Sequence, residues 1–169
     1  MDNTYLSKEY HISEIHNQEE KSAFARAVLE SLPDWFGNRA SLEEYVKGVR
    51  DLPFWAAVDG NGNCLGFFSA RIHYGHTGDI YVCGVRPECH RMGIGRALYD
   101  RTEHFFLEKG CKYAMVETLS DKADYAPYEK TRLFYKSVGF EPLITLTEMW
   151  DADNPCLIMV KSLSMRPFV

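Results

Sequence analysis

The chain has 169 residues, of which 46% are hydrophobic and 25% charged, and it carries a formal net charge of -5. This length and composition are typical of one globular domain, so we expect a single domain over residues 1–169. The acidic balance argues against nucleic acid as a partner, because phosphate binding requires clustered Lys and Arg. It mildly favours a cationic, amine-bearing ligand.

The cysteines and the apolar segments bear on the cellular compartment. The cysteine count is odd and no CxxC pair occurs, so the sequence suggests neither a disulfide framework nor a zinc knuckle at Cys64, Cys83, Cys89, Cys111 and Cys156. No apolar stretch approaches the roughly 20 residues of a membrane span. The first residues lack the basic and apolar regions of a signal peptide. We therefore expect a cytoplasmic protein without a membrane partner or a metal.

The first elements are a strand and two helices. Residues 8–15 alternate apolar and polar side chains, which predicts a strand. Asn17 is a helix N-cap, and the helix is expected to run to Leu32 because Pro33 follows. Ser41 with Glu44 forms a capping box that predicts a second helix over 41–51.

The rest of the chain alternates strands with two more helices. Glycine-rich turns separate strands expected at 54–59, 64–73 and 79–85. A helix at 93–109, a strand at 112–119, a helix at 127–137 and strands near 143–149 and 156–163 follow. The order β-α-α-β-β-β-α-β-α-β-β predicts an α/β (α+β) fold with one mixed sheet flanked by helices.

One strand-to-helix connection carries chemistry. The segment His90-Arg91-Met92-Gly93-Ile94-Gly95-Arg96 follows the strand at 79–85 and opens a helix. Glycine lets the backbone approach a ligand closely, and the free N–H groups at a helix start suit a pyrophosphate. A tight corner with solvated arginines is the alternative interpretation.

The context of this turn resembles the GNAT (GCN5-related) family of N-acetyltransferases. Residues 90–95 are similar to the family's Gln/Arg-x-x-Gly-x-Gly/Ala fingerprint, with His90 in the Gln/Arg position. Downstream, Tyr135-Lys136-Ser137-Val138-Gly139-Phe140 is similar to its Tyr-x-x-x-Gly-Phe element. Tyr128 stands where many members carry an Asn that contacts pantetheine, which is a departure from the family pattern.

The resemblance implies a fold, a reaction and a cofactor site. It implies a mostly antiparallel mixed sheet of about six or seven strands with about four helices, and acetyl transfer from acetyl-CoA to a primary amine of a small molecule or protein. A non-catalytic acyl-CoA-binding module on the same fold is the alternative. The residues implied to bind acetyl-CoA are Val82, Cys83, Gly84, Val85, His90, Arg91, Met92, Gly93, Ile94, Gly95, Arg96 and Tyr128. A bulge that opens the cofactor slot is expected in the strand 79–85, and Gly84 is consistent with it.

Two residues are candidates for proton transfer. Asp79 is the candidate base for the acceptor amine, directly or through water, although a cap after Gly78 is an equal alternative. Tyr135 is the candidate acid for the departing thiolate, with a core tyrosine as the alternative. A covalent route through Cys83 or Cys89 is disfavoured, because no activating His is placed beside either.

The acceptor side is less defined. Aromatic residues expected near the acceptor are Trp35, Phe36, Tyr125 and Trp150, and a core-covering role is the alternative for them. The segment 150–156 suggests a shaped lid. His73 and His76 lack a third metal ligand and are interpreted as structural or substrate-facing. Exposed strand edges make a homodimer plausible.

Overall fold

The computed structural model describes residues 9–163, and within them seven strands form one sheet flanked by four α-helices. The strands are β1 (Tyr10–Glu14), β2 (Phe54–Asp59), β3 (Cys64–His73), β4 (Thr77–Val85), β5 (Tyr113–Leu119), β6 (Glu141–Asp151) and β7 (Asn154–Ser162). The helices are α1 (Gln18–Glu30), α2 (Arg39–Gly48), α3 (Ile94–Glu108) and α4 (Pro127–Ser137). Short 3-10 turns lie at Val49–Asp51, Pro87–Cys89 and Asp121–Ala123. The predicted mixed sheet flanked by helices is confirmed.

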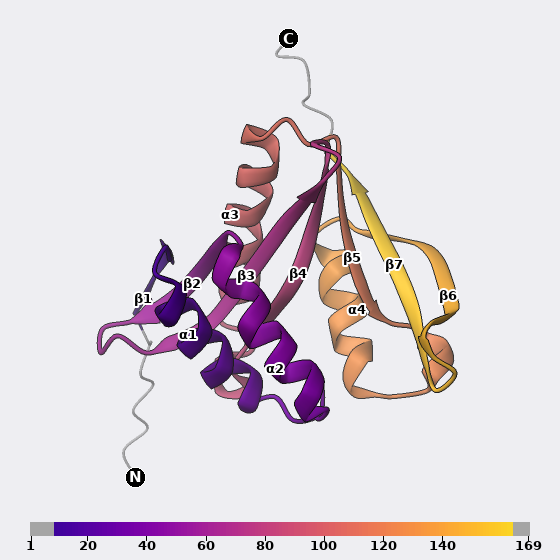
Figure 1. The fold of residues 1–169 in the computed structure, drawn as a ribbon, viewed down its shortest axis with the longest axis horizontal. Coiled ribbons are helices and arrows are strands. Elements are labelled where there is room, and N and C mark those ends of the chain that lie inside the picture. The colour runs from indigo at the N-terminus through magenta and orange to yellow at the C-terminus, as the bar shows by residue number, and fades with distance from the viewer. Residues whose placement is uncertain (1–8, 164–169) are drawn as a thin grey trace.

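The sheet order is β1-β2-β3-β4-β5-β7-β6, and β4 with β5 is the one parallel pair among these strands. Alternate residues of each central strand point to opposite faces. Phe67 belongs to the apolar cluster beneath α1 and α2, whereas Phe68 belongs to the cluster with α3 and α4. Figure 1 shows β4 and β5 close together at the upper end of the sheet and apart at the lower end.

The start of α2 corrects one sequence prediction. The helix begins at Arg39, and its N-cap is Asn38, whose Oδ1 accepts the Ser41 N–H at 3.0 Å. The predicted capping box at Ser41 is therefore wrong, because an equally good cap stands three residues earlier. Asn17 does cap α1, as predicted, and accepts the Glu20 N–H at 3.0 Å.

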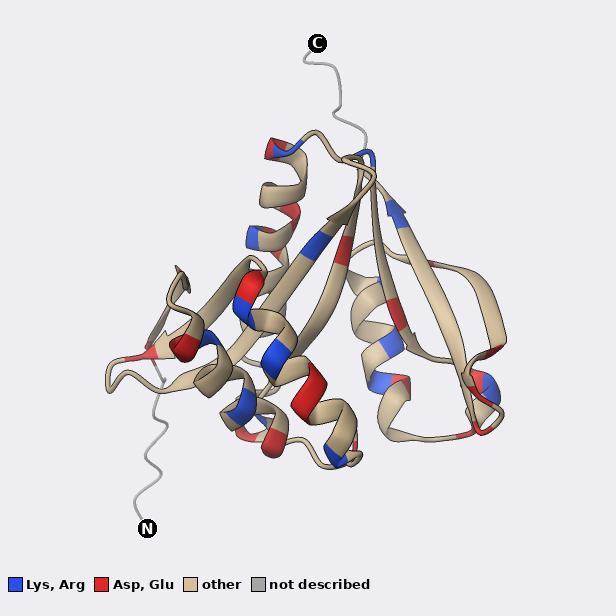
Figure 2. Cartoon of the chain, viewed as in Figure 1, with Lys and Arg blue, Asp and Glu red and all other residues tan. Residues whose placement is uncertain are grey.

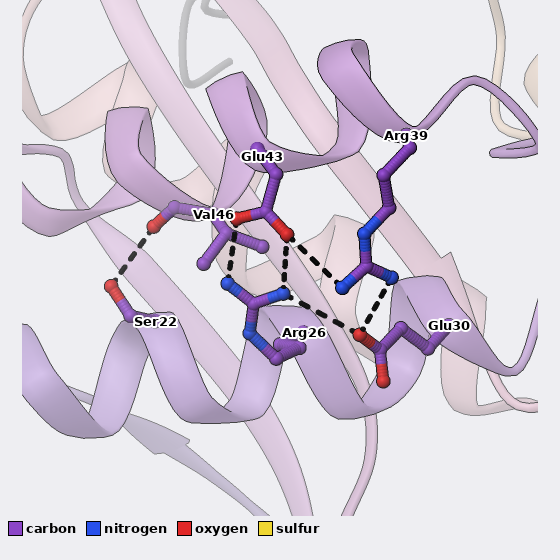
Figure 3. Close-up of polar contacts among 6 residues, drawn as sticks. All are labelled: Ser22, Arg26, Glu30, Arg39, Glu43 and Val46. Carbon is purple, nitrogen blue, oxygen red and sulfur yellow. Dashed lines mark hydrogen bonds and ion pairs between the residues drawn. The ribbon is translucent and has the colours of Figure 1, made fainter.

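An ion-pair network joins α1 to α2 (Figure 3). Arg26 donates two hydrogen bonds of 2.7 Å to the Glu43 carboxylate, and Arg39 contacts both Glu30 and Glu43. Ser22 adds a hydrogen bond from its hydroxyl to the Val46 carbonyl. Exposed pairs contribute little individually, but a bidentate network fixes the relative orientation of two helices. This orientation sets the path of the loop between them.

The packing of α3 on β4 generates a prediction about Gly78. A Cβ at Gly78 would overlap the ring of Phe106, which is fully buried. Gly78→Ala should therefore lower the free energy of unfolding by about 1–3 kcal/mol, as overpacking does. Denaturant unfolding followed by fluorescence measures the change. Gly60→Ala is the matched control, because nothing lies within 4 Å of its added Cβ. It should stay within about 0.5 kcal/mol of the wild type.

Candidate functional site

The site begins where β4 and β5 separate. Their parallel pairing covers Thr77 to Ile80 on β4 and ends at the pair Ile80–Val116. Beyond this point β4 stays paired with β3 as far as Val85, and β5 stays paired with β7 as far as Leu119. The two halves of the sheet therefore enclose a wedge-shaped opening between strands that no longer share hydrogen bonds.

A bulge in β4 coincides with this separation. Ser69 pairs with Val82 and Ala70 with Ile80, so Tyr81 is the extra residue. An extra residue increases local twist and turns a strand away from its neighbour. The expectation of a bulge in this strand is confirmed, but its assignment to Gly84 is wrong. Gly84 instead lets α1 and the residues after it approach β4 closely, because a Cβ there would lie 3.2 Å from Val28 Cγ1 and 2.9 Å from Leu32 Cδ1.

The predicted glycine turn leads into α3 with a strained backbone. Arg91 has φ +64° and Gly93, the N-cap, has φ +78°. No side chain caps this helix, and the first intrahelical bond shown is from Ala97 N–H to the Gly93 carbonyl at 3.0 Å. The preceding N–H groups point out of the helix end, where the helix dipole is positive. The turn has the donors and the field to bind an anion.

The residues of this turn contact three different parts of the fold, namely β4, α4 and the apolar core. His90 Nε2 contacts the Val85 carbonyl at 2.8 Å and so ties the turn to the end of β4. Arg96 donates to the Ser137 carbonyl at 3.0 Å. A Cβ at Gly95 would lie 3.2 Å from the Phe134 ring, so the second glycine lets α4 pack against α3. Met92 packs against the apolar core.

A cavity of about 620 Å³ runs from this turn through the opening between β4 and β5. That volume is in the range of small-molecule sites. It is lined by almost every residue predicted to bind the cofactor, namely Val82, Cys83, Gly84, Val85, His90, Arg91, Gly93, Ile94, Gly95, Arg96 and Tyr128. Three predicted site residues do not line it, namely Asp79, Met92 and Tyr125, whereas Tyr135, Trp35, Phe36 and Trp150 do.

Tyr135 is part of the cavity wall. Its side chain is buried, and its hydroxyl is 3.2 Å from Cys83 Sγ. Burial raises the pKa of the Tyr135 phenol well above its ordinary value. Burial likewise raises the pKa of the Cys83 thiol to about 11. Both groups are therefore protonated near neutral pH, and the phenol is a neutral hydrogen-bond donor.

Asp79 lies on the same strand but outside the cavity. It is 2% exposed, and its Oδ2 accepts from Arg71 Nε and contacts His73 Nε2, each at 2.8 Å. Figure 2 shows a basic position on β3 beside acidic positions on β4 and β5, in the part of the sheet that α1 and α2 leave uncovered. Asp79 is thus held in a charge network with Arg71 and His73. It is not one of the residues that line the cavity.

Glu117 is the carboxylate that does line the cavity. It lies on β5, and its pKa is raised by partial burial and by the charge of Asp79, while Arg71 and His73 oppose the increase. Sequence reasoning missed it. The available signal was a carboxylate inside an otherwise apolar strand, YAMVETL, that runs beside β4.

The loop between α1 and α2 reaches across the cavity to α4. Trp35 Nε1 donates to Thr131 Oγ1 at 2.9 Å, and Tyr128 donates its hydroxyl to the Trp35 carbonyl at 3.0 Å. Tyr125 donates to the Asp34 carbonyl at 2.8 Å. The Trp35 ring also lies edge-on to His90, with 6.2 Å between ring centroids. These contacts connect the two halves of the sheet.

Aromatic rings continue along the α2 side of the cavity. Phe36 packs edge-on against Tyr45 and Tyr45 against Tyr81, with centroid separations of 5.9 and 5.5 Å. The Tyr81 ring fits under Gly48 of α2, where a Cβ would overlap its hydroxyl. The bulge therefore adds an aromatic wall as well as separating the strands.

The segment 150–156 is a hairpin and not a lid. Strands β6 and β7 continue through it, and Asp151 Oδ1 accepts the N–H groups of Asp153 and Asn154 at 3.0 Å each. A short polar side chain that satisfies its own turn explains the composition. Trp150 still lines the cavity, although it is 43% exposed.

The two histidines His73 and His76 each have a side-chain partner. His73 contacts Asp79 and His76 Nδ1 contacts Thr77 Oγ1 at 2.7 Å. Within residues 9–163, no three His, Cys, Asp or Glu side chains gather in a metal-binding arrangement. No helix in that same range is long and apolar enough to cross a bilayer.

Known proteins share both the sequence pattern and the fold. A mycothiol acetyltransferase of Arthrobacter sp. (strain FB24) is 34% identical over 105 residues, which are 59% of this chain and 28% of that protein. An aminoglycoside 6′-N-acetyltransferase solved with coenzyme A superposes with a TM-score of 0.70 at 18% identity, covering 94% of this chain and 99% of the other. The ribosomal-protein-S18-alanine N-acetyltransferase of Escherichia coli gives 0.71 at 17% identity, covering 94% and 96%. The profile of the acetyltransferase (GNAT) family matches residues 11–140, so this chain belongs to that family.

Proposed function

We propose that the protein is an acetyl-CoA-dependent N-acetyltransferase that acts on a primary amine of a small molecule. The observation that carries the proposal is the continuous cavity that joins the free N–H groups of α3 to the opening between β4 and β5. An anion site and a narrow slot in series fit a ligand with a diphosphate at one end and a long, thin arm.

The residues present fit coenzyme A. The N–H groups at Ile94 and Gly95 would hold the diphosphate, with Arg91 beside them. The β4 backbone from Val82 to Val85 borders the slot and would pair with an extended arm as an added strand does. Acetyl-CoA supplies the acetyl group as a thioester. A relative solved with coenzyme A supports the assignment at the level of the fold.

We assign the base to Glu117 in preference to Asp79. An amine attacks only after it loses a proton, and a carboxyl with a raised pKa is a better acceptor for that proton. Glu117 has this property and lines the cavity, whereas Asp79 is enclosed by Arg71 and His73. Asp79 acts as a positioning residue, because its charge helps to raise the pKa of Glu117.

Tyr135 remains the proposed acid. Its neutral phenol lies in the cavity wall, where it can donate a proton to the departing sulfur. The raised pKa keeps the phenol neutral, so it can donate a hydrogen bond to the sulfur as negative charge develops there.

The charges and rings of the cavity define the acceptor further. Among the described lining residues Glu117 is the one carboxylate, and aromatic side chains surround its approach. One carboxylate and several rings suit a single ammonium on an apolar or aromatic molecule. A polycation would find one charged partner only. We therefore propose a small monoamine with an apolar or aromatic substituent.

Cys83 provides a test of direct transfer. Because its thiol pKa is about 11, the thiol is protonated at pH 7 and a poor nucleophile. Intact-mass measurement after incubation with acetyl-CoA alone should show no acetylated protein, and Cys83→Ser should keep turnover within about threefold, since a hydroxyl preserves the contact with Tyr135. A stable acetyl adduct that Cys83→Ser abolishes together with turnover would establish the covalent route instead.

Glu117 and Asp79 generate a pH prediction. Glu117→Gln should lower kcat/KM by about 10²–10⁴-fold, the usual contribution of a general base. The base works when deprotonated, so activity falls as pH falls through the pKa of Glu117. Asp79→Asn removes a charge that raises this pKa and should move the acidic limb of the kcat/KM profile to lower pH.

The control for this pair is Glu108→Gln, because the Glu108 side chain is 63% exposed on α3 and its ion-pair partner is His104. It should leave the profile unchanged. An acidic limb that stays in place in Asp79→Asn would contradict the coupling of the two carboxylates.

Tyr135→Phe distinguishes an enzyme from a binding module. Calorimetry should show that coenzyme A binds wild type and variant with dissociation constants within about twofold, while kcat falls by about 10²-fold or more. Release of free thiol from acetyl-CoA measures kcat with a panel of monoamines, polyamines and aminoglycosides, and aromatic monoamines should give the highest kcat/KM.

Tyr113→Phe is the matched control, because Tyr113 is 46% exposed at the start of β5. Binding of coenzyme A without thiol release for any amine would leave only a binding module. No binding at millimolar coenzyme A would refute the proposed function.

A further inference from the structure

Two neighbours hold the Arg71 side chain in place beside the cavity. Its Nε donates to Asp79 Oδ2 at 2.8 Å, and its guanidinium carbon lies 4.9 Å from the centre of the Tyr81 ring. Asp79 is buried, and Tyr81 is one of the residues that line the cavity. An ion pair and a stacking contact together fix the plane of the guanidinium. A ligand of Arg71 would therefore meet a group that is already ordered.

The two terminal nitrogens of Arg71 have no partner in the protein. Within residues 9–163 the guanidinium makes its hydrogen bond through Nε, and 39% of the side chain is exposed. Arg26 differs, because both of its terminal nitrogens donate to Glu43. Two N–H groups on one rigid plane match the two oxygens of a carboxylate. Arg71 thus has an unused edge whose geometry fits a carboxylate.

Arg71 lies on the same face of the sheet as the proposed base. Arg71 on β3 pairs with Asp79 on β4, which pairs in turn with Met115 on β5. Glu117 is two residues beyond Met115, so its side chain points to the same face. Arg71 is also close enough to oppose the rise in the Glu117 pKa that burial and the charge of Asp79 cause. A carboxylate site and a proton acceptor therefore lie near each other on the face that α1 and α2 leave uncovered (Figure 2).

The charges of this face define the acceptor that fits it. An ammonium near Glu117 has a carboxylate as its partner, and a carboxylate near Arg71 has a guanidinium. A molecule that carries both groups adds no net charge to the network, whereas a simple amine leaves the terminal nitrogens of Arg71 to water. The rings of Phe36, Tyr45 and Tyr81 form the adjoining wall and suit an aromatic substituent.

We propose that Arg71 is a specificity-determining residue whose two terminal nitrogens bind a carboxylate of the acceptor, so that the acceptor is an aromatic amino carboxylate. The inference rests on the proposed function and deepens it, because it adds a second recognised group to the monoamine. The carboxylate anchors the molecule at Arg71 while Glu117 accepts the proton of its ammonium. Asp79 holds the Arg71 Nε and so positions the anchor.

The test compares amines that differ in a single carboxylate. Phenylalanine is matched with phenethylamine, and 4-(aminomethyl)benzoate with benzylamine, so that a short and a long separation of the two charges are covered. We expect the wild type to show a kcat/KM about 10- to 100-fold higher for the carboxylate member of at least one pair, as hydrogen bonds to a charged group predict. Release of free thiol from acetyl-CoA measures the rates.

Two variants of Arg71 assign this preference. Arg71→Gln should abolish it, and the readout is the ratio of the two kcat/KM values within a pair. A change in the pKa of Glu117 affects both members of a pair and cancels in that ratio. Arg71→Lys keeps a positive charge beside Asp79 without the planar fork, so it answers the question even if Arg71→Gln unfolds. It should keep phenethylamine activity within about threefold of the wild type and lose most of the preference.

Arg101→Gln is the matched control, because Arg101 is exposed on α3, which packs on the other side of the sheet. It should leave both ratios unchanged. Calorimetry should give a dissociation constant for coenzyme A within about threefold of the wild type for each Arg71 variant, because Arg71 does not line the cavity.

The outcomes separate the inference from the function. If the wild type prefers neither carboxylate, or if the preference survives in both Arg71 variants, the role of Arg71 is refuted while the proposed function stands. Equal losses for both members of a pair also refute it, because they indicate that Arg71 serves only the charges of Asp79 and Glu117. Binding of coenzyme A without thiol release from any amine overturns the proposed function and this inference with it.

Discussion

The loss of pairing between β4 and β5 beyond Ile80 and Val116 is the constraint on which the rest of the structure depends. Backbone groups in the interior of a sheet are normally satisfied by the neighbouring strand. Here the two strands stop sharing hydrogen bonds in the middle of the sheet, yet each keeps its other neighbour, so the fold remains intact while its centre opens. The extra residue Tyr81 produces this divergence at the place where the cavity begins.

The opening also separates the polar groups by face. Tyr135 belongs to the side of the sheet covered by α3 and α4, whereas Glu117, Asp79 and Arg71 belong to the opposite side. A molecule that enters from one side and a second that enters from the other would meet in the slot between the strands. The sheet therefore places a candidate proton acceptor and a candidate proton donor on opposite sides of one narrow passage.

Most of the fold follows from local sequence signals. Asn17 as a cap and the glycine turns at both ends of α3 each act within a few residues, so the elements were predictable from the chain alone. Asn38 shows the limit of such signals, because two good caps competed and the sequence alone does not rank them. Boundaries of this kind are decided by how the helix docks.

The site residues that belong to a contiguous motif were predictable from the sequence. Those whose role depends on how two strands pair were not. Residues 90–96 and Tyr135 are recognised by spacing. Glu117 becomes a candidate only once the register of β5 against β4 is known, because that pairing ends at the residue before it. Asp79 was an attractive base because of its place on β4, but its partners come from β3, a pairing that spacing does not reveal.

The three hydrogen bonds between the α1–α2 loop and the α4 region have a thermodynamic consequence. The pairing of Ile80 with Val116 closes one end of the opening between β4 and β5. The three hydrogen bonds hold the two sides together at the other end. The width of the passage is thus set by folding, before any ligand arrives. The conformational entropy that the protein loses on folding is not lost again when a ligand binds. A long and flexible ligand therefore meets a preorganised channel, and the entropy cost of binding comes mainly from ordering the ligand.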